Sequence, residues 1–541
     1  MRKSLFVLVC FILVLGASLT GCGNQKEEAT PTANNDKKNS TEPKVLNWNL
    51  HAEPPTADPG LAFDTTAMAI AKALFDGLTR TGEDGKPHES VAEKIDISPD
   101  LKTYTFTLRD TKWSNGDPLT AHDFEFAWKR VLDPKTAAQA AFLMYYIKNA
   151  EKANKGQSSL DEIGVKAIDD RTLQVTLENP TPFFIELTAH TVYLPVHKKT
   201  VESDQSWAAE AKTLIGNGPF KIEGWDHKNK MILAKNENYW DKSAVKLDKI
   251  NFSMVEDENT ELSMYENGDI DWAGSPMSFL PTDAMPALKE SGKLTSQPFA
   301  ATYWFAFNVE KVPFTNAKIR KAFAYAINRQ TIVDNVLQGG QQPALGVLPP
   351  TMALKADGYF PDNDTETAKT LLAEGMKELG ISTLPPITLL FNTAEIQKKV
   401  AEAAQDQWRK NLGVEVKLEN QELKVYLQNM AQGNFQVGRL GWSGAFNDPI
   451  NFLELFKEKN VPNNAPKWEN PEYIELLNRS GIEPDPAKRK QLLAQAEQIL
   501  MNEMPVAPVY YYTYSFVHNP KVKGVLIDGL GKVDWKWADK E

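Results

Sequence analysis

The stretch FQVGRLGWSGAFNDPINF, residues 435–452, joins an apolar strand pattern to glycines, one arginine, one tryptophan and a closing proline. The alternating apolar residues predict a mostly buried strand, and Gly441 and Gly444 predict a turn that another backbone can approach. Ligands often bind where a strand ends in such a turn, and Trp442 beside Arg439 offers a stacking surface and a charge for a carboxylate. A core tryptophan, a surface arginine and ordinary turn glycines explain the same residues, so both interpretations stay open.

Regular elements are predicted on both sides of this stretch. From residue 387 the order strand, helix, strand, helix, strand predicts parallel strands joined by right-handed crossovers. Earlier in the chain, short alternating runs predict a largely antiparallel region. The individual expectations include strands at 387–392, 414–420 and 506–517, a helix from 67 ended by Gly77, one continuous helix at 316–333 capped by Asn316, and a helix beginning at Pro486.

Length and composition limit the class of protein. With 541 residues, 42% of them hydrophobic and 24% charged, the chain is long enough for two or three domains with full cores. The formal net charge of -11 argues against nucleic acid as a partner.

The first residues predict export and a lipid anchor. Arg2 and Lys3 precede an apolar run too short to span a membrane, which indicates a secretory signal. Leu-Thr-Gly before Cys22 resembles the lipobox of bacterial lipoproteins, in which the cysteine is diacylated and becomes the first residue. A plain secretory signal with an incidental cysteine is the alternative. Residues 23–44 contain no large apolar side chain and predict a flexible tether.

Catalytic and metal-binding motifs are missing from the sequence. The seven histidines are scattered and form no HExxH pattern, and there is no GxSxG elbow, P-loop or GxGxxG after a strand. We therefore expect no catalytic residues, no metal and no cofactor.

Several long, ordered segments resemble one family across nearly the whole mature chain. The segments are LFDGLTR at 74–80, YTFTLRDTKWSNGDPLTAHDFEFAWKRVLDP at 104–134, GNGPFKIEGW at 216–225, NAKIRKAFAYAINR at 316–329, GWSGAFNDPINFLELF at 441–456 and MPVAPVYYY at 504–512. Together they resemble the solute-binding lipoproteins of bacterial ABC peptide importers, of the oligopeptide-binding kind.

The resemblance implies an α/β fold of the periplasmic-binding-protein-like, two-lobe class II type, with an extra domain and mixed sheets. The implied domains are a signal peptide (1–21), a tether (22–44), lobe I in three segments (45–75, 205–300 and 511–541), the extra domain (76–204) and lobe II (301–510). It also implies a monomer on the extracytoplasmic face of the cell membrane, of Gram-positive type, that works with the transmembrane subunits of an ABC permease.

The resemblance also implies the ligand contacts. A peptide would lie as an extra strand between two protein segments, so that backbone hydrogen bonds supply affinity. The family pattern assigns these contacts to Asp64, Thr65 and Thr66 on one side and to Gly441, Trp442 and Ser443 on the other. It assigns Arg439 to a carboxylate of the peptide. It also places one tyrosine of 510–512 near the ligand, and we predict that this residue is Tyr511.

Two positions depart from the family pattern. Ala445 stands where the family has an aspartate for the peptide's amino terminus, and Leu423 stands where a tryptophan commonly lines a side-chain pocket. Family drift, with Asp64 or Asp448 serving the amine, is one explanation, and a changed ligand class is the other. The second explanation predicts weaker binding of peptides with a free amino terminus than in relatives.

The sequence therefore predicts a tethered receptor that captures oligopeptides or peptide-like ligands for import and catalyses no reaction. A receptor for a peptide pheromone and a binder of a non-peptide solute remain the alternatives.

Overall fold

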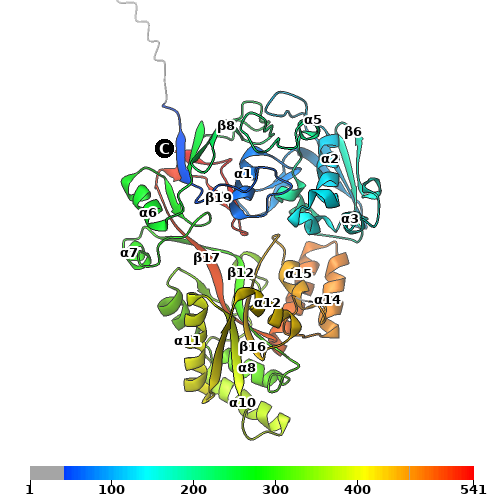
Figure 1. Ribbon diagram of the computed structural model, residues 1–541. Helices are drawn as coiled ribbons and strands as arrows, with labels where there is room; N and C mark the ends of the chain where they lie inside the picture. Colours follow the sequence, from blue (N-terminus) through cyan, green and yellow to red (C-terminus); the bar gives the residue numbers. More distant parts are fainter. Residues whose placement is uncertain (1–41, 462) are drawn as a thin grey trace, which may run out of the picture. The chain divides into compact units, whose positions relative to one another are not determined.

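The computed structural model describes residues 42–461 and 463–541, and Figure 1 shows their helices and strands. Cys22 and most of the tether lie outside the described residues. Residues Pro43–Glu541 form one unit with its own core. No helix in the described ranges has the length and apolar character needed to cross a membrane.

Three sheets organise this unit, and the largest is mixed. Its strands follow the order β11 (Trp272–Gly274), β17 (Val506–His518), β12 (Thr295–Phe307), β16 (Val437–Ser443), β14 (Ile387–Asn392) and β15 (Val416–Gln421), with β13 (Gln342–Pro343) paired to β17. The strands β16, β14 and β15 are parallel, as the sequence predicts, and the others pair antiparallel.

Two four-stranded sheets come from the first half of the chain. One has the order β1 (Val45–Asn49), β10 (Lys249–Ser253), β9 (Lys230–Lys235) and β8 (Phe220–Asp226), and the other has the order β4 (Ala92–Ile97), β5 (Thr103–Leu108), β7 (Thr172–Thr176) and β6 (Val165–Asp169). Every neighbouring pair in them is antiparallel except β1 with β10. The predicted antiparallel region is therefore confirmed.

The remaining strands form three hairpins or ribbons, and helices surround the sheets. The ribbons are β2 (Thr79–Thr81) with β3 (Pro87–Glu89), β18 (Val522–Lys523) with β21 (Asp539–Lys540), and β19 (Leu526–Ile527) with β20 (Val533–Asp534). The helices are α1 (Thr65–Leu74), α2 (Ala121–Leu132), α3 (Ala150–Asn154), α4 (Phe184–Thr188), α5 (Lys198–Ser203), α6 (Glu258–Asn267), α7 (Met285–Glu290), α8 (Ala317–Tyr325), α9 (Arg329–Ile332), α10 (Thr365–Leu379), α11 (Glu395–Leu412), α12 (Leu423–Gln432), α13 (Ile450–Leu453), α14 (Pro471–Ile482) and α15 (Pro486–Glu503).

Aromatic packing joins segments that are far apart in the sequence. Trp48 of β1 stacks on Trp272 of β11 with ring centroids 4.5 Å apart, and it meets Trp535 edge-on at 5.6 Å. These rings connect the N-terminal strand, the middle of the chain and the C-terminal segment. The predicted domain boundaries stay a prediction, and both β12 and β17 run without a break through boundaries drawn at 300/301 and 510/511.

Three local expectations are wrong, each because side chains or backbone partners compete with the repeat pattern. The predicted helix at 316–333 breaks after Tyr325, where Asn328 caps a new helix by accepting a hydrogen bond from the Thr331 backbone N–H at 2.9 Å. α1 ends at Leu74 rather than at Gly77. β16 continues to Ser443, so the turn begins at Gly444 and not at Gly441.

Candidate functional site

β16 separates the two side chains that the sequence placed together. Side chains alternate along a strand, so Arg439 and Trp442 lie on opposite faces of the sheet. The Arg439 Nε donates to Asn392 Oδ1 at 2.8 Å, and its guanidinium lies over the Tyr303 ring at 5.7 Å. The Trp442 Nε1 donates to Asn451 Oδ1 at 2.8 Å, toward α13. The expected pairing of a stacking tryptophan with a neighbouring cation is therefore wrong.

The tyrosines of β17 also divide between the two faces. Tyr510 stacks on Tyr303 with centroids 4.7 Å apart and meets Tyr512 edge-on at 5.0 Å, which places both on the face that carries Arg439. Tyr511 lies on the other face, where its hydroxyl donates to the Gly346 carbonyl at 3.2 Å and borders a cavity of about 480 Å³ beside Glu497. Tyr512 is thus better placed than Tyr511 to share a ligand with Arg439.

The N-terminal contact segment is the start of a helix. Asp64 caps α1 by accepting a hydrogen bond from the Ala67 backbone N–H at 3.0 Å, and Thr65 and Thr66 are the first two helical residues. Leu423 begins α12 with 49% of its surface exposed. The structure brings none of these four residues into the pocket described next.

The loop after β16 is fixed by hydrogen bonds and by an aromatic stack. The Gly444 backbone N–H donates to the Ala300 carbonyl at 2.7 Å, and Phe446 stacks on Phe183 with centroids 5.2 Å apart. The Asn447 Nδ2 donates to the Gly85 carbonyl at 3.0 Å. The first contact holds the loop to β12, and the other two hold it against the segment that contains β2, β3 and α4.

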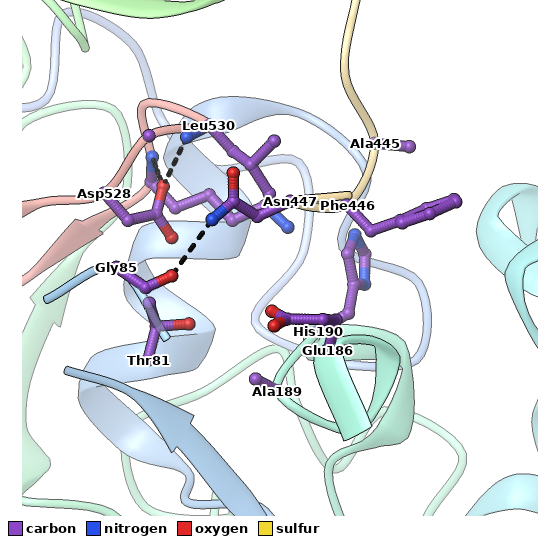
Figure 2. Close-up of a pocket in the computed structure, with 12 residues that line it drawn as sticks. Thr81, Gly85, Glu186, Ala189, His190, Ala445, Phe446, Asn447, Asp528 and Leu530 are labelled. Atoms are coloured by element: carbon purple, nitrogen blue, oxygen red, sulfur yellow. Dashed lines mark hydrogen bonds between the residues drawn. The ribbon is translucent and has the colours of Figure 1, made fainter. Parts of the chain in front are cut away.

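A small polar pocket lies beside this loop, and Figure 2 shows Ala445 and Phe446 across from Glu186 and His190. Its volume of about 20 Å³ admits a group the size of a water molecule. The lining consists of Thr81, Gly85, Glu186, Ala189, His190, Ala445, Phe446, Asn447, Asp528, Gly529, Leu530 and Lys532. Ala445 is the single predicted ligand residue among them.

Neither proposed substitute for the missing aspartate offers a free carboxylate in this pocket. Asp448 is bound by both terminal nitrogens of Arg489, at 2.6 and 2.8 Å, and it accepts a further hydrogen bond from the Ile450 backbone N–H at 2.9 Å. Asp64 caps α1 through Oδ1 and does not line the pocket. A free carboxylate for an amine in this pocket therefore has to come from another residue.

The titratable groups of the pocket have displaced pKa values. Burial, with Asp448 and Asp84 nearby, raises the pKa of Glu186 to about 8. Burial lowers the pKa of Lys532 to about 8, and burial also holds the pKa of His190 well below its usual range. At pH 7 these shifts favour the neutral forms of His190 and Glu186.

Asp528 is fully engaged at the other end of the pocket. It accepts hydrogen bonds from the backbone N–H groups of Leu530 and Lys532, both at 2.9 Å, and its second oxygen lies 3.6 Å from Lys72 Nζ. No group of three or more His, Cys, Asp or Glu side chains that could hold a metal occurs within 42–461 and 463–541.

Sequence reasoning missed Glu186, Asp528 and Lys532 because each comes from a segment remote from 435–452. One local signal existed. Glu186 is a lone acid in the apolar run PFFIEL, where Phe184 and Leu187 are fully buried. An unpaired acid in such a run is an uncommon placement unless it has a partner or a role.

Comparison with known proteins gives consistent results. Residues 86–464 match the family model for bacterial extracellular solute-binding proteins, family 5 Middle. The chain is 48% identical to the oligopeptide-binding protein OppA of Bacillus subtilis (strain 168), with 99% of each chain covered.

Solved structures agree with that result. The unliganded open form of the periplasmic murein tripeptide-binding protein MppA has a TM-score of 0.85 and 33% identity, covering 92% of this chain and 98% of that one. Haemophilus influenzae OppA in complex with RPPGFSPFR has a TM-score of 0.67 and 32% identity, with coverage of 92% and 99%. The predicted fold class is confirmed.

Proposed function

Because the chain belongs to family 5 of the bacterial extracellular solute-binding proteins, we propose that it captures oligopeptides and delivers them to the permease of an ABC importer. The observation that carries this proposal is the 48% identity over 99% of both chains to an oligopeptide-binding protein. A second relative, the dipeptide-binding protein DppE of Bacillus subtilis, is 40% identical over 98% of both chains. The protein binds its ligand and catalyses no reaction.

The backbone of β16 supports the choice of a peptide. β12 pairs with β16 along Val437–Ser443, but β14 on the other side reaches only Val437 and Gly438. The Arg439 carbonyl accepts a hydrogen bond from the Tyr426 hydroxyl, so the strand edge beyond Arg439 is the part available for an added strand, and a peptide can pair with it irrespective of its side chains. In this proposal Gly441 and Ser443 offer backbone groups, Arg439 and Tyr512 take a carboxylate on one face, and Trp442 and Leu423 contact ligand side chains.

The proposal includes a lipid anchor at Cys22, extension of residues 23–44 as a tether, and a monomer on the extracytoplasmic face of the membrane. The anchor is supported by the sequence Leu-Thr-Gly-Cys. Cys22→Ser should release the protein into the medium. Full membrane association of that variant would contradict the anchor.

The peptide ligand is tested by calorimetric titration of the purified protein with random dipeptide, tetrapeptide and hexapeptide libraries. We expect saturable binding of at least one library and no binding of free amino acids. A binder of a non-peptide solute would respond to none of the three libraries. A receptor for one pheromone would respond to a single sequence and not to a mixture.

A further inference from the structure

The pocket beside Ala445 contains acceptor atoms that lack donors. The carboxylate of Glu186 makes no hydrogen bond and no ion pair within the described part of the chain, although it lines the pocket. The buried Oδ1 of Asn447 also accepts no hydrogen bond there. Glu186 is half-buried and the Oδ1 atom of Asn447 is fully buried, and acceptors that lose water without gaining a donor cost free energy.

The surroundings of Glu186 do not supply the missing charge. Asp448 and Asp84 raise its pKa, while Lys86 and Arg489 lower it by less. Arg489 is already committed to Asp448, and His190 is neutral. Lys532, the one lysine of the lining, is influenced by Asp528 and Lys72.

The size and polarity of the pocket define what would satisfy it. A volume of about 20 Å³ admits a water-sized group. A primary ammonium has that size, a positive charge and three N–H donors. A bound ammonium would convert the protonated Glu186 to a carboxylate and form a charge-assisted hydrogen bond with it.

We propose that Glu186 binds a primary ammonium group of the ligand in the pocket that it shares with Ala445. The inference rests on the proposed peptide-binding function and names the residue that selects for a free amine. Two sources offer this group: the amino terminus of a peptide and a lysine-type side chain.

The test uses the mature protein and a lysine-free random tetrapeptide library, prepared with free or with acetylated amino termini. Wild type should bind the free library more tightly by about tenfold to a hundredfold, and Glu186→Gln should remove most of that preference while binding the acetylated library unchanged. A second pair of libraries is acetylated at the amino terminus, and one contains lysine where the other contains Nε-acetyl-lysine. If wild type distinguishes only this second pair, the bound ammonium belongs to a lysine side chain.

Proton release on ligand binding distinguishes a Glu186 that binds the ammonium from a Glu186 that only supports the fold. In titrations at pH 7 in buffers of different ionisation enthalpy, wild type should release close to one proton on binding the amine, because Glu186 ionises. Glu186→Gln should release none. Equal proton release by both proteins would overturn the inference.

Three variants serve as controls. Asp84→Asn removes a negative charge near Glu186 without touching the lining, and it should leave most of the preference intact. Ala445→Asp in the Glu186→Gln background should restore the preference from the opposite wall. Lys532→Met removes a positive charge from the pocket lining and should strengthen the preference, and a loss of preference in this variant would contradict the proposal.

The outcomes separate this inference from the proposed function. If wild type discriminates neither pair of libraries, or if Glu186→Gln keeps the preference, peptide binding stands and the role of Glu186 is rejected. If none of the dipeptide, tetrapeptide and hexapeptide libraries binds, the proposed function fails and the inference fails with it.

Discussion

Asp76 and Glu186 are two inward-facing carboxyl groups with opposite surroundings. Asp76 has no exposed surface and accepts hydrogen bonds from Ser90, Tyr239 and Trp240 at 2.7, 2.7 and 2.9 Å. Its other oxygen accepts from Arg80 at 3.3 Å. Glu186 has no such partner within the described ranges.

Their pKa values move in opposite directions. Burial alone would raise the pKa of Asp76, but Arg80, Lys536 and the hydrogen bonds bring it below its usual value. Burial raises the pKa of Glu186 to about 8. Desolvation is therefore offset inside the protein at the fully buried Asp76 and, in our proposal, by the ligand at the half-buried Glu186.

The largest expected effect comes from Asp76→Asn, which removes the charge and keeps the size. Because Asp76 faces Arg80 in a fully buried network, we expect a loss of about 3 kcal/mol in the free energy of unfolding. Urea denaturation at pH 7 measures it. A loss below about 1 kcal/mol would show that the negative charge of Asp76 contributes little to the stability of this network.

Arg489→Met would remove the partner of Asp448 and leave it, like Glu186, without an ion pair in the described part of the chain. The guanidinium binds both oxygens of Asp448, so its removal should cost about 2 kcal/mol of stability. It should also raise the pKa of Glu186 further, because Arg489 opposes the shift. Stability and the pH midpoint of proton release on binding would both be measured. A lowered midpoint would contradict the electrostatic account.

The pH dependence of stability should differ for the two acids. The pKa of Glu186 is raised on folding, so its contribution is fully present below pH 4.5 and is lost as the pH rises to about 8. The pKa of Asp76 is lowered, so its contribution is lost only as the pH falls below 3.8. Glu186→Gln should therefore stabilise the ligand-free protein at pH 8 by about 1 kcal/mol and leave pH 4 unchanged. Glu497, whose pKa is raised to about 7, should keep part of the slope in both proteins. If the free energy of unfolding changes with pH equally in wild type and in Glu186→Gln, the pH dependence comes entirely from other groups.

Trp442→Ala should have the smallest effect on stability. Trp442 is half-buried and donates one hydrogen bond to Asn451. Its truncation should therefore lower the free energy of unfolding by clearly less than the roughly 3–5 kcal/mol that truncation of a core tryptophan costs. We expect weaker peptide binding and the loss of a ligand-induced change in fluorescence. A large fall in melting temperature with unchanged affinity would identify it as a core residue.

The elements that could be predicted from sequence are those whose pattern is local. The order β14, α11, β15, α12, β16 follows from apolar spacing and from caps such as Gly413 at the end of α11. The break after Tyr325 could not be predicted, because Asn328 caps the next helix within an unbroken apolar stripe.

The candidate site was less predictable than the fold. The sequence identified the loop containing Ala445, but it paired Arg439 with Trp442 although strand alternation separates them. It did not indicate Glu186, because the pocket forms only when α4, the loop after β16 and the β19–β20 hairpin meet. Contacts of that kind depend on tertiary packing and not on residue spacing.

Capture of peptides for import is tested most directly by native mass spectrometry of the protein purified from its own cells. The account predicts an added mass that is lost on denaturation and that sequences as one or more short peptides. An added mass that is not a peptide, or a protein that is empty and takes up none of the three peptide libraries, would contradict it.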